Sequence, residues 1–224
     1  MNPAGPLLDN DHLFAEICAR LRARDLFDED VTWSENVQPP TEPDAFARET
    51  IFVIANSGMH HDVARQIYQR CLGAIDRGES CTTVFGHVGK ATAMDRIWAD
   101  RADLLAGYNA ADDKIAFCRS LPWIGGITCY HLAKNFGAAV AKPDVHLMRL
   151  AERHATNPQD LCAALAERTG YKISTIDLIL WRACAVGILD GNTSELVAPK
   201  PPAPPPEPYQ QPLFQPVQAE MFPF

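Results

Sequence analysis

The sequence predicts an all-α protein, and three observations lead to this prediction. Apolar residues recur at intervals of three and four along most of the chain, which is the spacing of an amphipathic helix. Residues that favour helix N-termini, such as Asp and Ser, precede several of these segments. No segment shows sustained alternation of apolar and polar residues with β-branched enrichment, so we expect strands to be few or absent.

Residues 1–44 form the first predicted part of the chain, an N-terminal helix followed by a polar linker. The apolar face of this helix comprises Leu13, Phe14, Ile17 and Leu21. Asp9 or Asp11 can cap its start. The linker is rich in proline and polar residues (ENVQPPTEPD).

Residues 45–190 form the body, for which the pattern predicts helices throughout. We expect them over residues 45–56, 61–74, 90–105, 112–120, 126–136, 145–155, 158–168 and 174–188. Asp44 can cap the first of these helices. Ser174 and Asp177 have the spacing of a capping box at the start of the last one.

Residues 191–224 form the third part. Ten of the 18 prolines lie from Pro199 onward, so we expect this tail to be extended and disordered.

The formal net charge of −8 argues against a nucleic-acid partner, but the charge is unevenly distributed. Residues 1–50 carry 4 basic and 11 acidic side chains, whereas residues 51–198 carry 15 of each. The range 114–154 holds six Lys or Arg residues against two acidic ones. This segment can therefore bind phosphate. The alternative is that its Lys and Arg residues only lie on ordinary solvated helix faces.

The sequence also indicates the cellular compartment in which the protein resides. Its longest uncharged stretch is too short to span a bilayer, and the N-terminus lacks the basic and apolar regions of a signal peptide. The seven cysteines are an odd number without a C-x-x-C pair, which is typical of thiols in a reducing cytosol. We expect a cytoplasmic protein with no membrane partner and no metal site.

The most informative segment runs from Leu121 to Glu152 (LPWIGGITCYHLAKNFGAAVAKPDVHLMRLAE). Pro122 ends one helix, Gly125 and Gly126 permit a tight hairpin with positive φ, and Thr128 begins a second helix. The backbone amides at such a helix N-terminus form a site for a phosphate group. The alternative for this pattern is a plain turn between two helices.

Asp144 stands immediately before the next apolar-periodic segment and is a candidate helix N-cap. Amide donors and the helix dipole favour the anionic form of a carboxylate at that place. Near a bound phosphate, such an anion can stabilise an oxocarbenium-like transition state or position a water. The structural alternative is that Asp144 only caps the helix.

These residues resemble the helix–hairpin–helix (HhH-GPD) DNA glycosylases related to endonuclease III. The hairpin pattern of that family is matched by Leu121, Pro122, Ile124, Gly125 and Thr128, and its second block by Pro143, Asp144, His146 and Arg149. An upstream block is matched by Gly86, Lys90 and Ala91. The resemblance covers residues 45–190.

The resemblance implies a two-lobed helical fold with a central cleft and an enzyme that extrudes a damaged or modified base from double-stranded DNA and cleaves its glycosidic bond. Asp144 would stabilise the sugar cation and direct the water. The implied DNA-binding residues are Trp123, Gly125, Gly126, Ile127, Thr128, Lys142, His146, Arg149, Met59 and His60. Met59 or His60 would fill the vacated stack, although both also fit an ordinary exposed turn. A monovalent cation at the hairpin carbonyls is a further implication.

Three departures from the family pattern matter. Trp123 replaces the first hairpin glycine. Ile127 stands where lyase-competent relatives carry a Schiff-base lysine, so the resemblance implies a monofunctional glycosylase, with Lys142 and Lys90 as the other amines to consider. Beyond Asp160 only two cysteines follow, so we expect no iron–sulfur cluster.

The tail carries an independent signal. Gln210, Leu213 and Phe214 resemble the short peptide by which bacterial repair proteins bind the replication sliding clamp, and residues 218–222 are a looser version. The alternative is a chance match in a tail rich in Gln and Pro.

The sequence thus predicts a DNA glycosylase of base excision repair, associated with the nucleoid of a bacterial cytoplasm. It does not show which base is removed. Two other functions remain open: a catalytically silent helix–hairpin–helix DNA-binding protein, and a helical adaptor without a role on DNA.

Overall fold

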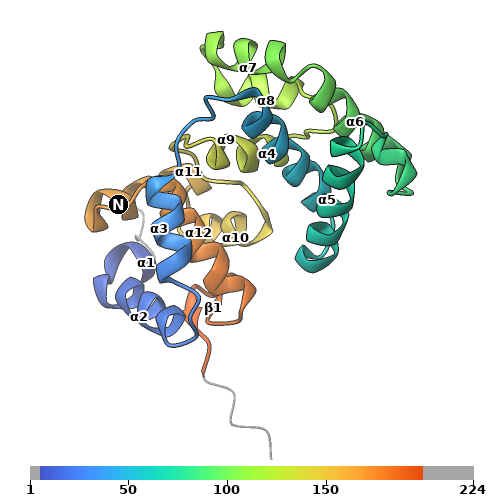
Figure 1. Cartoon of the computed structure of the whole chain (residues 1–224). Coiled ribbons are helices and arrows are strands. Elements are labelled where there is room, and N and C mark those ends of the chain that lie inside the picture. Colours follow the sequence, from blue (N-terminus) through green and yellow to red (C-terminus); the bar gives the residue numbers. More distant parts are fainter. Residues whose placement is uncertain (1–5, 199–224) are drawn as a thin grey trace, which may run out of the picture.

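The computed structural model describes residues 6–198, and for Pro6, Asp9, Asp11 and His61 it describes the backbone alone. This part of the chain is mostly helical, which confirms the predicted fold class at that level (Figure 1). Its two strands, β1 (Leu189–Asp190) and β2 (Glu195–Leu196), pair antiparallel in one short hairpin. None of the helices described has the length and apolar character needed to cross a membrane.

The helices follow one another along the chain with short connections. They are α1 (Pro6–Asp9), α2 (Asp11–Arg22), α3 (Asp28–Asn36), α4 (Pro43–Asn56), α5 (His61–Asp76), the 3-10 turn η1 (Cys81–Thr83), α6 (Val88–Ala99), α7 (Arg101–Ala110), α8 (Lys114–Ser120), α9 (Thr128–Asn135), α10 (Val145–Arg153), α11 (Pro158–Thr169) and α12 (Ile173–Ala185).

Most helices expected in the body begin and end within three residues of the observed bounds, and two larger differences stand out. Helix α3 lies in the segment expected to be a linker, and three acidic residues in its first turn complement the helix dipole. The single helix expected over 90–105 is two helices, because α6 ends at Ala99 and Asp100 begins the next turn with its amide bonded to the Arg96 carbonyl.

Two predicted caps were wrong. The side chain that caps α2 is that of Asn10, whose Oδ1 accepts from the His12 amide at 3.0 Å. Helix α4 starts one residue before Asp44, with Pro43 in its first turn, where the missing amide of proline costs no hydrogen bond.

Helices α4 to α9 pack around one core, which we call the first group (Figure 1). Its centre is a set of three aromatic rings. Phe46 of α4 stacks on Phe136 with 5.0 Å between ring centroids, and Tyr108 of α7 meets Phe136 edge-on at 5.1 Å. Aromatic contacts of this kind stabilise a core beyond the area that they bury.

The second group combines both ends of the described chain. Helices α1 and α2 share one core with α10, α11 and α12, and α3 packs on α12. Phe14, Ile17 and Leu21, from the predicted apolar face of the N-terminal helix, are buried in this core. Helix α4 begins at Pro43, and the residues predicted as one body, 45–190, contribute to both cores.

Two connections join the groups, residues 37–42 and residues 136–144, and they touch each other. Gly137 has φ of +83°, and a Cβ placed there would lie 3.3 Å from the Val37 carbonyl oxygen and 3.4 Å from Pro39. Glycine is therefore required both by the backbone conformation and by the close approach.

Candidate active site

The turn between α8 and α9 presents backbone amides to solvent. Leu121 and Ile124 anchor the turn in the first core, while Gly125, Gly126 and Ile127 are exposed. Within residues 6–198, the amides of those three exposed residues donate no hydrogen bond. A Cβ added at either glycine would meet no atom within 4 Å. The helix is thus preceded by exposed, unsatisfied donors, and the glycines beside them leave room for a ligand to approach the backbone, which suits an anion.

Trp123 adopts the left-handed conformation, with φ of +63°, and the two glycines of the turn do not. The expectation of positive φ at Gly125 and Gly126 was therefore wrong. The Trp123 ring lies edge-on to His87 with 5.0 Å between centroids, and it occupies the space that a Cβ on Gly89 would need. The side chain remains 46% exposed, so the strained residue packs on the start of α6 and also faces solvent.

Asp144 caps α10, as predicted. Its Oδ1 accepts hydrogen bonds from the amides of His146 at 3.0 Å and Leu147 at 3.1 Å. Its Oδ2 lies 3.8 Å from Nζ of Lys142, and the side chain is 13% exposed. One carboxylate oxygen is thus fixed by the helix, and the other faces an amine.

Behind Asp144 lies a buried ion pair that the sequence analysis did not identify. Oδ2 of Asp177 accepts from Nζ of Lys134, and Oδ1 accepts from the Lys142 amide at 3.0 Å. The side chains of Lys134 and Asp177 are 9% and 1% exposed. Burial raises the pKa of the Asp177 carboxyl, and the charge of Lys134 opposes that rise.

The predicted capping box at Ser174 and Asp177 was therefore wrong. Helix α12 begins at Ile173 after Lys172, and no side chain caps it. Asp177 lies in the second turn, where its carboxylate accepts hydrogen bonds from α9 and from the connection over residues 136–144.

His131 precedes Lys134 by three residues on α9, so the two side chains share a face of that helix. Burial, together with the charges of Lys142 and Lys134, lowers the pKa of His131 to about 3. Burial also lowers the pKa of Lys142, while Asp144 raises it. We call His131, Lys134, Lys142, Asp144 and Asp177 the charged cluster; its members come from both groups and from the connection between them.

Lys90 has a different role from that of a reacting amine. Its buried Nζ donates to the carbonyl oxygens of Ser57 at 2.6 Å and Ala55 at 3.3 Å, at the end of α4. It thereby holds the turn that carries Met59 and His60. Met59 packs partly against the first core and His60 is exposed. Within residues 6–198, no hydrogen bond or ion pair joins this turn to the charged cluster.

The other predicted DNA-binding residues lie at the start of α9 and on α10. Thr128 opens α9 and is half-buried. His146 follows Asp144 and is half-buried, and Arg149 is exposed on α10. The stem of Arg149 lies near Gly191, in the turn of the β hairpin. Gln210, Leu213 and Phe214 lie outside the described residues.

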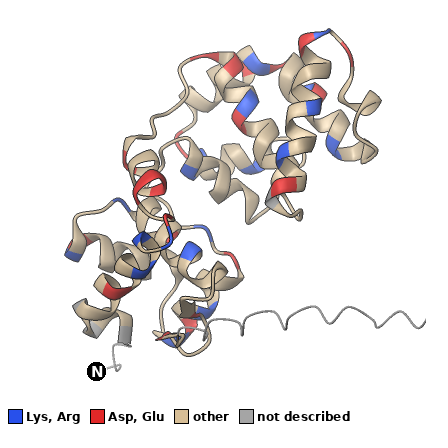
Figure 2. Cartoon of the chain, turned by 60° about the horizontal axis from the view of Figure 1, so that its bottom comes forward, with Lys and Arg blue, Asp and Glu red and all other residues tan. Residues whose placement is uncertain are grey.

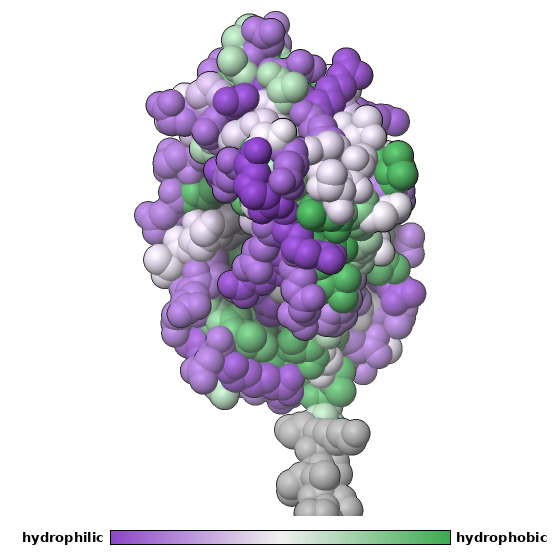
Figure 3. Space-filling model, turned by 45° about the vertical axis from the view of Figure 1, so that its right-hand side comes forward, coloured by the Kyte–Doolittle hydropathy of each residue, from purple (hydrophilic) through white to green (hydrophobic). Residues whose placement is uncertain are grey.

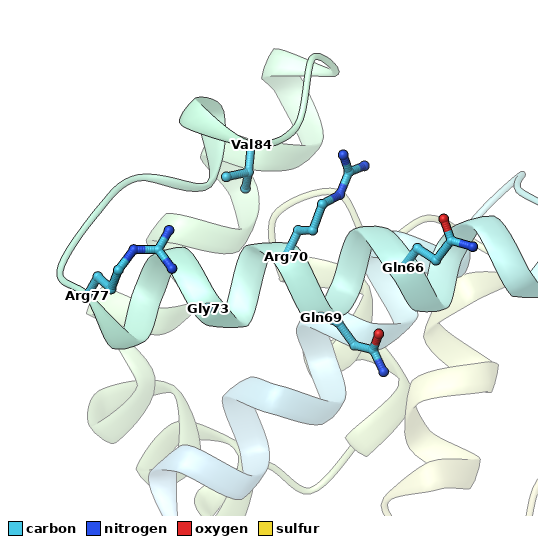
Figure 4. Close-up of a pocket in the computed structure, with 6 residues that line it drawn as sticks. All are labelled: Gln66, Gln69, Arg70, Gly73, Arg77 and Val84. Atoms are coloured by element: carbon cyan, nitrogen blue, oxygen red, sulfur yellow. The ribbon is translucent and has the colours of Figure 1, made fainter.

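Two surface pockets lie away from these residues. The larger, of about 550 Å³, lies along α5 between Arg70, Arg77 and Val84 (Figure 4). The other, of about 340 Å³, lies between α2 and α11. Both are open and neither includes a residue of the charged cluster. We place the candidate site at the cluster, because the chemical groups converge there.

In the views of Figures 2 and 3, no area of a single charge sign or of continuous hydrophobic character identifies a ligand. Lys and Arg alternate with Asp and Glu over both groups of helices (Figure 2). On the face shown in Figure 3, hydrophilic residues predominate and hydrophobic residues form smaller areas between them. Among the described residues, no group of three or more His, Cys, Asp or Glu side chains has the geometry to hold a metal ion.

Comparison with known proteins found no matching family model, no matching curated protein and no matching solved structure. A function for this chain therefore rests on its motif and on the geometry of the site.

A sequence signal existed for the missed residues. Lys134 lies between buried Ala133 and buried Phe136, and Asp177 lies between buried Ile176 and half-buried Leu178. A lone charge inside an apolar helical run requires a partner, because an unpaired buried charge is costly. One basic and one acidic residue of this kind in the same chain indicate a pair.

We expect His131 to make stability depend on pH. The pKa of His131 is about 3 in the folded protein and about 6.5 in an unfolded chain, so the unfolded state binds more protons between these values. Stability is therefore lost as pH falls, by about 2 kcal/mol between pH 7 and pH 5 from this group. Urea unfolding of wild type and His131→Gln at both pH values measures the difference.

The matched control is His60→Gln, which removes an exposed histidine. It should keep the wild-type pH dependence. If His131→Gln lost as much stability on acidification as the wild type does, a neutral buried His131 would be excluded.

Proposed function

We propose that this chain is a helix–hairpin–helix DNA glycosylase that hydrolytically removes a damaged or modified base from double-stranded DNA in base excision repair. The observation that carries the proposal is the position of α9. This helix has exposed, unsatisfied amides at its start, and Lys134 near its end joins the cluster that contains Asp144. Eight residues make it about 12 Å long, at 1.5 Å per residue.

The first step is binding of the DNA backbone. The amides of Gly125, Gly126 and Ile127 bind a phosphate next to the target nucleotide, aided by the dipole of α9. Trp123 and Thr128 flank that phosphate. A monovalent cation at the hairpin carbonyls is part of the same proposal.

The second step exposes the glycosidic bond. The target nucleotide leaves the base stack, because its sugar is out of reach within a duplex. Met59 or His60, on the turn held by Lys90, fills the space. Lys142, His146 and Arg149 contact the backbone around the extruded nucleotide. Electrostatic contacts of this kind depend on salt.

The third step is cleavage of the bond between base and sugar. Positive charge develops on the sugar ring, and Asp144 stabilises it from a fixed position. Its Oδ1 is held by two amides, which leaves Oδ2 to face the sugar or a water. Water attacks C1′, and the nucleobase leaves with the electron pair of the glycosidic bond. The proton released by the water passes to the carboxylate of Asp144.

Water, and not a lysine, is the proposed nucleophile. Ile127 has no amine at the place where related lyases carry one. The amines of Lys90 and Lys134 are engaged with backbone carbonyls and with Asp177. Lys142 is the amine beside Asp144, and it is the residue to examine if an imine intermediate is found.

The arrangement of the two groups supports the two-lobed HhH-GPD fold with a cleft between the lobes as part of this proposal. Each group has its own core, and the charged cluster includes α9 of the first and α12 of the second. A catalytic residue on the connection between two lobes can act on a substrate that contacts both.

A second candidate function is a silent DNA-binding protein that uses the same hairpin. The nearly complete occupation of Asp144 Oδ1 by helix amides favours it, because capping alone accounts for that oxygen. A helical adaptor without a DNA role is the third candidate; it predicts DNA binding that is absent or insensitive to salt.

Incubation with duplexes that carry alkylated, oxidised, deaminated or otherwise modified bases, followed by hot alkali, tests the proposal directly. Strand breaks at one modified base are expected only after alkali. Breaks without alkali, together with an adduct trapped by borohydride, would replace the hydrolytic mechanism by an amine-based one. Salt-dependent binding without breaks would favour the silent protein.

We expect Asp144→Asn to lower the single-turnover rate of excision at least about 100-fold while the dissociation constant for DNA changes less than about threefold. Asn also caps helices, so the fold is retained while the negative charge is lost. Rate and binding are measured on the same duplex, and thermal unfolding checks the fold.

Asp113→Asn is a matched control. Asp113 caps α8 with the same geometry, accepting from the amides of Ile115 and Ala116 at 2.9 Å each. This variant should excise at the wild-type rate. Equal losses of excision rate in both variants would show that Asp144 only caps its helix. A change in the stability of Asp144→Asn without a change in rate would show the same.

We propose the replication sliding clamp as a partner through the C-terminal tail. Replacing Gln210, Leu213 and Phe214 with alanine should abolish binding to purified clamp, because apolar anchors on a short peptide supply most of its affinity. Excision by the same variant should be unchanged. Surface plasmon resonance on immobilised clamp measures binding; undiminished binding by the variant would reject these residues as the docking site, and no binding by wild type would reject the partner.

A further inference from the structure

We propose that Asp177 is a positioning residue that sets the place of Asp144 relative to the hairpin, a role that rests on the proposed function. The carboxylate of Asp177 joins two segments. One oxygen accepts from Lys134 on α9, and the other accepts from the backbone amide of Lys142 at 3.0 Å. The helix that begins with the phosphate-binding amides and the segment that carries Asp144 thus meet at one side chain.

The position of Lys142 determines that of Asp144 because the intervening chain is stiff. Pro143 separates them and has a fixed φ. The Asp144 amide donates to the Lys142 carbonyl at 2.8 Å, which closes the segment into a tight turn. Holding the Lys142 amide therefore holds the carboxylate of Asp144.

The same segment has a second anchor. Gln159 of α11 accepts from the Ala141 amide at 2.8 Å and donates to the Ala139 carbonyl at 3.2 Å. This anchor ties the connection to the second group but makes no contact with α9. Ala138 and Val140 pack the connection against the first core, and Asp177 adds the polar tie, since its carboxylate accepts both from the connection and from α9.

The chemistry of Asp177 fits positioning better than simple stabilisation. A buried ion pair can often be replaced by apolar residues without loss of stability. The part-buried Lys142 amide, by contrast, needs an acceptor at this place, because an amide donor that is removed from water and left unsatisfied is costly. A carboxylate supplies that acceptor and the partner for Lys134 at the same time.

Two double variants, both of which lack the link from Lys134 to Asp177, isolate the contribution of the Lys142 acceptor to the position of Asp144. Lys134→Met with Asp177→Asn removes both charges and keeps an oxygen for the Lys142 amide. Lys134→Met with Asp177→Leu removes both charges and that oxygen. Both avoid an unpaired buried charge, and Asn and Leu share the same branched side-chain skeleton, with Leu the bulkier, so the acceptor is the chief polar difference between the two proteins.

We expect the Leu variant to excise about 100-fold more slowly than the Asn variant in single turnover, since a misplacement of about 1 Å has effects of that size. The substrate is the duplex that wild type cleaves best. Binding to a duplex with a tetrahydrofuran abasic site should differ less than threefold between them, because the hairpin is untouched. Equal excision rates would overturn the proposal.

Amide exchange gives a readout that does not depend on activity. The amides of His146 and Leu147 are bonded to Asp144 and report its position. They should exchange at least about tenfold faster in the Leu variant than in the Asn variant. Equal exchange would overturn the positioning role even if the rates differed.

Failure of the proposed function has a different signature. If wild type excised no base from any duplex, the glycosylase assignment would fail, and the positioning role would fail with it as a statement about catalysis. If wild type is active while both double variants match each other in rate and exchange, only the role of Asp177 is rejected.

Discussion

One buried carboxylate holds together the parts of this molecule that matter for its chemistry. Asp177 accepts hydrogen bonds from Lys134 of the first group and from the backbone of the connection that leads to Asp144. Charges so deeply placed persist only when every oxygen and every proton has a partner, and that condition admits few geometries. The relative placement of α9 and α10 is therefore determined by polar contacts as well as by apolar packing.

Much of the local structure could be predicted from the chain. Periodicity located most of the helices, and the place of Asp144 at the start of α10 followed from Pro143 and the apolar run after it. The break at Asp100 and the helix over Asp28–Asn36 escaped prediction, and for the helix the reason is a neighbour that is distant in sequence. Helix α3 packs on α12, more than a hundred residues later.

The site was predictable only where a local rule applies. A hairpin and a cap each lie within a few consecutive residues, and both were found. The pairing of Lys134 with Asp177 spans 43 positions, so a lone charge in each apolar run indicates that a partner is needed but not which residue supplies it. The conformation of Trp123 shows the reverse problem: the glycines that follow it have ordinary φ values, and the bulky residue takes the left-handed one because its ring finds a place beside His87 and Gly89.

The arrangement of the two cores also bears on the order in which the molecule assembles during synthesis. The first core uses one uninterrupted stretch, from Phe46 to Phe136, so it can form as soon as that stretch leaves the ribosome. The second core needs Leu7 and Leu189 together. Until α12 emerges, the apolar face of α2 remains exposed to solvent. During that interval the nascent chain depends on dilution or on chaperones to avoid aggregation.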